Sequence, residues 1–236
     1  MGSDQFQFKQ FTIVQDRCAM KVGTDGVLLG AWTNPKGAQS ILDIGTGTGL
    51  IALMLAQRST AEIDAVEIDL DSYLQARENV ARSPWQHRTR VYHCTIQDYL
   101  CSSSKLYDLL VANPPFFSNV SKAANPARTL ARHDDRLTPI DLLNVAHRLL
   151  KADGRLTVIY PCTVANSFRE LVKKQGFFCN QILWIKPTPN IPPKRVLIEI
   201  SRTKFYYPDQ EIVIKTDRHT YTSRFLELVR EFYLKY

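Results

Sequence analysis

The sequence predicts an α/β protein built on a mostly parallel sheet with helices on both faces. Three observations support this prediction. Short apolar runs alternate with helical segments along most of the chain, as in strands joined by crossover helices. A glycine-rich turn joins the first strand of this series to its helix, and Asn113-Pro114-Pro115-Phe116 follows the fourth. Because the carboxyl ends of parallel strands share one edge of a sheet, we expect a ligand site at that edge.

The composition is that of an ordinary globular protein. The chain has 236 residues, of which 44% are hydrophobic and 22% charged, and this suits one large domain. No signal-peptide pattern opens the sequence, and no apolar run approaches the ~18 residues of a membrane span, so we expect a cytoplasmic protein. Its five cysteines are odd in number and lack Cys-x-x-Cys spacing, which predicts free thiols and no metal site.

Basic residues are concentrated in the second half of the chain. Residues 1–110 contain 10 Lys and Arg against 12 Asp and Glu, whereas residues 111–236 contain 20 against 11. Because Lys and Arg make most contacts to phosphate, this asymmetry suggests a cofactor-binding half and a surface that faces a polyanion. Many basic proteins bind no nucleic acid, so charge alone does not decide the partner.

The first elements are a short strand or arm, indicated by apolar residues between Phe6 and Val14, and a helix within residues 21–32. We expect Thr24 or Asp25 to cap this helix, which would open at Gly26. Such a helix start can face a ligand. The local pattern fits equally well a purely structural helix whose apolar residues fill the core.

The next strand leads into Gly45-Thr46-Gly47-Thr48-Gly49 and then into an apolar helix. Glycines let the backbone turn sharply and approach a nucleotide closely. The spacing is G-x-G-x-G, which differs from the G-x-G-x-x-G pattern that binds a pyrophosphate. Asp43, just before the turn, would repel a pyrophosphate but suits a positively charged cofactor. A tight turn without a ligand remains the alternative.

Acidic residues follow the second and third strands of the series. Glu67 ends a strand at residues 62–69, at the spacing where a carboxylate accepts hydrogen bonds from ribose hydroxyls. Asp69 is expected to cap the next helix, over residues 72–80; capping by all of these acids is the alternative. A third strand is predicted over residues 90–98, where Asp98 or the backbone beside it can meet an adenine amino group.

The fourth strand, residues 109–112, must end at Asn113 because Pro114 has no N–H with which to continue the ladder. An exocyclic amine on an aromatic ring is a poor nucleophile, because its lone pair is delocalised. The side-chain carbonyl of Asn113 and the main-chain carbonyl of Pro114 are two acceptors that can favour a tetrahedral nitrogen. Phe116 offers a face on which an unstacked base can lie. A simple turn is the alternative.

The remaining elements are a polar stretch at residues 118–136, a helix at 141–150, a strand at 155–160, a helix at 167–174 and two strands at 178–186 and 194–201. The short proline-rich link between the last two strands makes them antiparallel. Lys194 and Arg195 follow this link and are predicted to belong to the surface that faces a polyanion. Basic and aromatic residues of the tail can extend the same surface, while its apolar members pack a terminal helix.

Taken together, four motifs resemble the class I S-adenosylmethionine-dependent methyltransferases of the amino-methylating branch: Asp43 to Gly49, Glu67-Ile68-Asp69, Gln97-Asp98 and Asn113-Pro114-Pro115-Phe116. The resemblance covers about residues 20–200. More narrowly, Lys21 to Gly30, Ala131 to Asp134 and Phe232 to Leu234 resemble the bacterial tRNA adenine-N6 methyltransferases that act beside the anticodon of a valine tRNA.

The resemblance implies a Rossmann-like seven-stranded, mostly parallel sheet with an antiparallel last strand, in a single domain over residues 1–236. That domain would comprise an amino-terminal arm and helix at 1–35, a core at 36–204 and a carboxyl-terminal extension at 205–236. It also implies S-adenosylmethionine as cofactor and tRNA as partner, with no metal, no membrane and a monomer or weak homodimer.

The site residues expected from these motifs fall into three groups. The catalytic group is Asn113, Pro114 and Phe116. The cofactor-binding group is Lys21, Thr24, Asp43, Gly45, Gly47, Gly49, Glu67, Asp98 and Asn113. The RNA-binding group is Phe116, Lys122, Arg128, Arg132, Lys194 and Arg195.

Three alternatives stay open at this point. An Asn-Pro-Pro motif followed by an aromatic residue also serves to methylate a glutamine amide in release factors, since planar amides pose the same chemical problem. A nucleotide-binding module without transferase activity, or a dinucleotide oxidoreductase, would share the fold. Pro161-Cys162 also matches the nucleophile pair of cytosine-C5 methyltransferases. In the methyltransferase order the reactive motif follows the fourth strand, whereas this pair follows the fifth. We therefore predict a structural role for Cys162.

Overall fold

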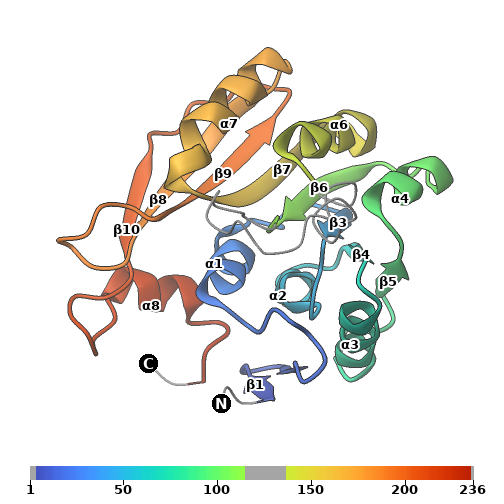
Figure 1. Cartoon of the computed structure of the whole chain (residues 1–236), viewed down its shortest axis with the longest axis horizontal. Helices are drawn as coiled ribbons and strands as arrows, with labels where there is room; N and C mark the ends of the chain where they lie inside the picture. Colours follow the sequence, from blue (N-terminus) through green and yellow to red (C-terminus); the bar gives the residue numbers. More distant parts are fainter. Residues whose placement is uncertain (1–3, 115–136, 235–236) are drawn as a thin grey trace, which may run out of the picture.

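The structure is a computed structural model that describes residues 4–114 and 137–234. Its largest feature is a sheet of eight strands among the described residues, in the order β10-β8-β9-β7-β6-β3-β4-β5. Helices cover both faces of this sheet (Figure 1). The predicted fold class is therefore confirmed, and the sheet has one strand more than the seven expected.

The five central strands run parallel to one another. They are β3 (Ser40–Ile44), β4 (Glu62–Glu67), β5 (Thr89–His93), β6 (Tyr107–Ala112) and β7 (Leu150–Pro161). β3 lies between β4 and β6, so the strand that precedes the glycine turn is at the centre of this group. Its apolar side chains are buried on both faces, as a parallel strand requires.

The antiparallel ending of the sheet is also confirmed. β8 (Phe178–Lys186) and β9 (Arg195–Ser201) pair antiparallel, and β9 is inserted between β8 and β7. The additional strand, β10 (Gln210–Val213), pairs parallel to β8 at the sheet edge. Only Ile212 of β10 is buried, so the strand lacks the apolar run that would reveal it in the sequence.

Seven helices are described. They are α1 (Thr24–Trp32), α2 (Leu50–Gln57), α3 (Leu70–Ala81), α4 (Ile96–Ser102), α6 (Pro139–Leu149), α7 (Cys162–Lys174) and α8 (Ser223–Val229). One buried cluster joins α1, α2 and α8 to one face of the sheet, and a second joins α4, α6 and α7 to the other. The arm contributes a two-stranded hairpin, β1 (Gln5–Gln7) and β2 (Thr12–Val14), whose neighbours Phe8 and Phe11 enter the first cluster.

The predicted start of α1 at Gly26 is wrong. The helix begins at Thr24, with Gly23 at the N-cap and no side-chain cap. Gly26 instead lies inside the helix, where α1 packs closely on α2: a Cβ on Gly26 would come within 3.0 Å of Leu50 Cδ2. Local capping rules placed this boundary two residues late because Gly23, which has no side chain, is the N-cap.

The predicted third strand is too long. β5 ends at His93, and residues 96–102 form α4. The Thr95 hydroxyl accepts a hydrogen bond from the Asp98 N–H at 2.9 Å and donates to the Asp98 carboxylate at 2.8 Å. This side-chain cap starts a helix where the sequence suggested a continuing strand.

Two further predictions from composition can be compared with the described residues. All five cysteines are free thiols, as expected. No helix in the described ranges is long and apolar enough to cross a membrane.

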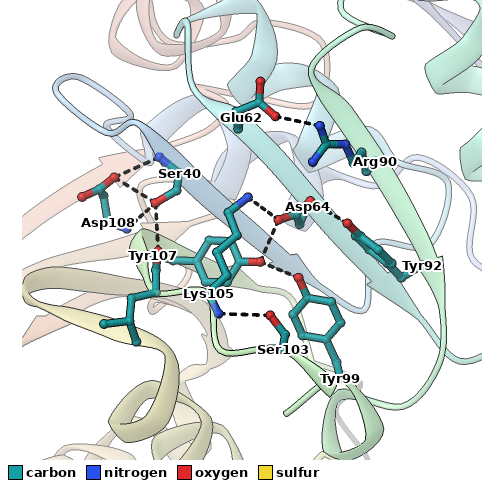
Figure 2. Close-up of polar contacts among 11 residues, drawn as sticks. Ser40, Glu62, Asp64, Arg90, Tyr92, Tyr99, Ser103, Lys105, Tyr107 and Asp108 are labelled. Carbon is teal, nitrogen blue, oxygen red and sulfur yellow. Dashed lines mark hydrogen bonds and ion pairs between the residues drawn. The ribbon is translucent and has the colours of Figure 1, made fainter. Parts of the chain in front are cut away.

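The buried carboxylate of Asp64 connects the strands β4, β5 and β6 (Figure 2). The Asp64 side chain, on β4, is 2% exposed and accepts from Lys105 Nζ at 2.6 Å, from the Tyr107 hydroxyl at 2.7 Å and from the Tyr92 hydroxyl at 3.2 Å. Tyr107 in turn lies 2.5 Å from the Tyr99 hydroxyl. Burial, together with these hydrogen bonds, raises the pKa of Tyr107, so its phenol stays protonated and donates to Asp64. The carboxylate is therefore paired and hydrogen-bonded, as a buried charge must be.

We predict that Asp64→Ala destabilises the protein by about 3 kcal/mol or more, because it leaves the Lys105 ammonium and the Tyr107 hydroxyl without their buried acceptor. Glu62→Ala on the same strand is the matched control: it removes an exposed pair with Arg90 at 3.4 Å, worth less than about 1 kcal/mol. Urea unfolding measures both values, and equal losses in the two variants would contradict the proposed role of Asp64.

Candidate functional site

Two cavities meet at the carboxyl ends of β3, β4 and β6. The first has a volume of about 410 Å³ and the second about 450 Å³. Five residues line both of them, namely Met20, Gly45, Gly47, Asn113 and Pro114. The glycine turn and the Asn-Pro pair, 68 residues apart from Gly45 to Asn113 in the chain, therefore lie at one junction, as the parallel sheet predicts.

The glycine turn adopts a backbone that requires glycine. Gly45, Gly47 and Gly49 have φ angles of +72°, +58° and +82°, in the left-handed region that other residues rarely occupy. Gly45 and Gly47 face the cavities, whereas Gly49 lines neither of them and forms the N-cap of α2, against the backbone of Ala76. The structure therefore places two of the three predicted cofactor glycines at the site.

Glu67 stands in the wall of the first cavity at the end of β4. Its side chain is nearly buried, with Oε2 accepting from the Gly47 N–H at 2.8 Å and Oε1 from the Asp69 N–H at 2.9 Å. Each carboxylate oxygen has a second lone pair, so Glu67 can still accept hydrogen bonds from a pair of hydroxyls. Asp69 caps α3 through the Ser72 N–H, as predicted.

Asp43 lies beneath the glycine turn and is completely buried. Its Oδ2 accepts from the Thr46 hydroxyl at 2.6 Å and from the Ala52 N–H at 3.1 Å, while Oδ1 has no partner among the described residues. Burial raises the pKa of Asp43 to about 7, and the nearby charge of Glu67 acts in the same direction. A cation bound above the turn would lower this pKa, so the buried carboxyl group of Asp43 suits a positively charged ligand.

The rest of the first cavity is largely apolar. Ile68, Ile96 and Leu137 line it together with Thr95 and Gln97. Asp98 does not line it; its carboxylate accepts from the Thr95 hydroxyl, and its neighbour Gln97 lines the cavity instead. Glu67, Asp69 and Asp71 also line it, and an apolar slot with carboxylates in its wall has the chemistry of a nucleoside site. The sequence interpretation missed the two isoleucines, although Ile68 immediately follows the end of β4 and Ile96 follows the end of β5 by three residues.

The second cavity is formed by the start of α1 and the segment before it. Lys21, Thr24 and Asp25 line it opposite Thr46 and Thr48 of the glycine turn. Lys21 and Thr24 thus line this cavity. Lys21 Nζ lies 3.3 Å from Asp4 Oδ1.

Buried side-chain amides of α3 hold the segment before α1 in place. Asn79 of α3 accepts from the Val14 N–H and donates to the carbonyls of Val14 and Thr48, each at 2.9 Å. Gln75, one turn earlier, accepts from the Arg17 N–H at 3.1 Å. The amino-terminal segment is therefore bonded to α3 and to the glycine turn. The signal in the sequence was the spacing of Gln75 and Asn79, four residues apart on one face of a helix, and the sequence interpretation missed it.

Asn113 follows β6 directly and lies at the junction of the two cavities, half-buried, with Pro114 buried beside it. Its side-chain amide makes no hydrogen bond to any other described residue. Both residues line both cavities, where a ligand that bridges the cavities would contact them. Phe116, Lys122, Arg128 and Arg132, together with Phe117 and His133, lie outside the described residues.

The remaining predicted residues lie farther along the same edge of the sheet. Lys194 is exposed, whereas Arg195 forms an ion pair with Asp25, with 2.7 Å between Nε and Oδ2. Neither lines a cavity. Cys162 begins α7 away from both cavities, and burial raises the pKa of its thiol; this is the opposite of what an activated nucleophile needs. Within the described ranges, no group of three or more His, Cys, Asp or Glu side chains is arranged to hold a metal ion.

The sequence around these cavities matches a known protein family. Residues 21–174 match the family model described as methyltransferase small domain. The chain belongs to this family. The matched residues include the glycine turn, Glu67 and Asn113, which are the groups that surround the two cavities.

Full-length relatives extend the comparison. The chain is 55% identical over 239 residues to a protein of Trichodesmium erythraeum named tRNA1(Val) (adenine(37)-N6)-methyltransferase, covering 100% of both chains. It is 44% identical over 236 residues to a protein of the same name from Parabacteroides distasonis, again with complete coverage. Among solved structures, a predicted O-methyltransferase from Agrobacterium tumefaciens superposes with a TM-score of 0.65 at 18% identity, covering 88% of this chain and 96% of that one. At this identity the last similarity shows the fold alone.

We predict that Asp43 makes stability fall as pH rises. Its pKa is about 7 in the folded state against about 3.9 when unfolded, so the folded state retains the proton longer. The contribution is fully present below pH ~4 and is lost as pH rises through ~7, with a slope of at most about 1.4 kcal/mol per pH unit. Urea unfolding of the wild type and Asp43→Asn between pH 5 and 8 measures the difference, because the amide cannot ionise. Parallel curves for the two proteins would contradict the raised pKa.

Proposed function

We propose that the protein transfers a methyl group from S-adenosylmethionine to the N6 amino group of an adenine in tRNA, next to the anticodon. The observation that carries this proposal is the agreement between full-length relatives of that name and the site itself: Asn113 lies where two cavities meet. The basic second half of the chain, with 20 Lys and Arg against 11 Asp and Glu, suits a polyanionic substrate.

The residues around the cavities fit the cofactor. We infer that the first cavity holds the adenosine, with Glu67 accepting the ribose hydroxyls and Ile68 and Ile96 packing against the adenine. Residues of the second cavity, with Lys21 and Thr24, are then placed to contact the methionine end. The buried Asp43 oxygen, which has no hydrogen-bond partner among the described residues, favours the positive charge of such a ligand. When bound, S-adenosylmethionine supplies an electrophilic methyl group on a sulfonium.

The chemistry of this chain lies in Asn113 and Pro114. The Asn113 side-chain carbonyl and the Pro114 main-chain carbonyl accept the two hydrogens of the amine, so that its lone pair is directed out of the ring plane. Pro114 has no N–H that competes for the same place. No ionised base is required, because the nitrogen becomes acidic once it carries the new methyl group and its proton leaves to water.

The substrate contacts of this proposal come from the basic residues. Lys194, exposed on the edge of the sheet that carries the site, and Lys122, Arg128 and Arg132 are proposed to contact RNA phosphates, and Phe116 to stack on the target base. We further propose a cytoplasmic protein of one domain that acts as a monomer or a weak homodimer. Sedimentation of the purified protein tests the oligomeric state.

The competing function from the same chemistry is methylation of a glutamine amide in a release factor. Asn113 and Pro114 would hold that planar amide in the same way. We predict that labelled S-adenosylmethionine transfers its methyl group to tRNA and not to release factor or DNA, and that nucleoside analysis finds N6-methyladenosine. Label in glutamine would replace the tRNA proposal, and binding of cofactor with no transfer to any acceptor would indicate a binding module.

We predict that Asn113→Ala lowers kcat by at least about 100-fold, the scale on which one lost transition-state hydrogen-bonding group acts, while cofactor affinity is largely retained. The reason is that Glu67 and the glycine turn, which carry the proposed cofactor contacts, do not depend on the Asn113 side chain. Calorimetry with S-adenosylhomocysteine measures the affinity and single-turnover transfer measures the rate. Equal losses in both would mean that Asn113 has a structural role.

A further inference from the structure

An ion pair joins two segments that lie 170 residues apart in the sequence. Arg195 Nε donates to Asp25 Oδ2 at 2.7 Å. Arg195 is the first residue of β9, where it pairs with Pro161 of β7 and Ile185 of β8. Asp25 is in the first turn of α1. A residue fixed between two strands of the sheet therefore holds the beginning of a helix.

The helix start that Arg195 contacts is also a wall of the second cavity. Asp25 and Gly26 line that cavity together with Asn113 and Pro114. The N-cap, Gly23, supplies no side-chain hydrogen bond to the first turn, so capping does not fix its direction. Gly26, the next residue, packs on Leu50 of α2. Asp25 provides the corresponding tie to the sheet.

The energetics favour a geometric role for this pair. Its side chains are 36% and 29% exposed, and pairs with this much contact with water add little to global stability. In contrast, a small displacement of a wall that orients reactants can reduce a rate by about 100-fold. Loss of the pair should therefore be seen in turnover more than in unfolding.

We propose that Arg195 is a positioning residue that acts through Asp25. It holds the first turn of α1 at the distance from Asn113 that the reacting groups require. This inference rests on the proposed function for its catalytic consequence, and it replaces the sequence-based prediction that Arg195 contacts RNA. The structural part, that Arg195 fixes the start of α1, does not depend on the substrate.

Hydrogen exchange tests the structural part without any substrate. Arg195→Ala and Asp25→Ala should both increase exchange of the amides in residues 21–28, because each removes the same tie. Arg90→Ala is the matched control, because it removes an ion pair with Glu62 between the strands β5 and β4. Exchange of the amides in residues 21–28 should be unchanged in this variant. Unaltered exchange in both site variants would overturn the proposal.

Turnover tests the catalytic part. Arg195→Ala and Asp25→Ala should each lower kcat about tenfold or more, with KM for tRNA little changed. The double variant should be no slower than the slower of the two single variants, because the contact between Arg195 and Asp25 is already lost in each of them. Arg195→Lys, which keeps a cation opposite Asp25, should recover most of the rate. Arg90→Ala should keep the wild-type rate.

Two results would overturn the catalytic part. If Arg195→Ala weakens RNA binding and reduces its salt dependence by about one ion while Asp25→Ala does neither, Arg195 contacts phosphate directly. If the losses of the two single variants multiply in the double variant, the residues act independently. A wild-type protein that fails to methylate tRNA would instead refute the proposed function, and the exchange experiment would still decide whether Arg195 positions α1.

Discussion

The site depends on the attachment of the glycine turn to the end of the neighbouring strand. The Gly45 and Thr46 N–H groups donate to the Val66 carbonyl at 2.9 and 3.1 Å, and the Gly47 N–H donates to Glu67 at 2.8 Å. The turn after β3 and the acid after β4 therefore form one unit. Because Glu67 is held by the turn, its carboxylate is already oriented in the cavity wall, which reduces the ordering that a ligand must bring about.

The other cavity walls are connected to this unit by residues that lie far from it in the sequence. Asn79 bonds the amino-terminal segment to the glycine turn through Thr48, and Arg195 bonds the start of α1 to β9. Asn113 arrives from β6, which pairs directly with β3. Parallel pairing brings the strand ends to one edge, and side-chain hydrogen bonds then place the parts that the sheet does not reach. This division explains why the cavities meet at Asn113 although their described walls come from six separate stretches of the chain.

Most of the central sheet could be predicted because its signals are local. The apolar runs of β3, β4 and β6, the glycines with positive φ and the proline after Asn113 each act within a few residues. The predicted cap by Asp69 is likewise a local interaction. The errors occurred where a local pattern allowed two outcomes: Thr95 begins a helix in place of a longer strand, and Gly26 lies inside α1 because Gly23 is the N-cap.

The sequence by itself determined the fold class and the groups at the strand ends, because periodicity and turn chemistry depend on neighbouring residues. Only the tertiary structure decided the partners of residues far apart in the chain. It paired Arg195 with Asp25, bonded Asn79 to two separate segments and added β10 to the sheet. These outcomes depend on which surfaces meet after the sheet has formed, and no local pattern encodes that geometry.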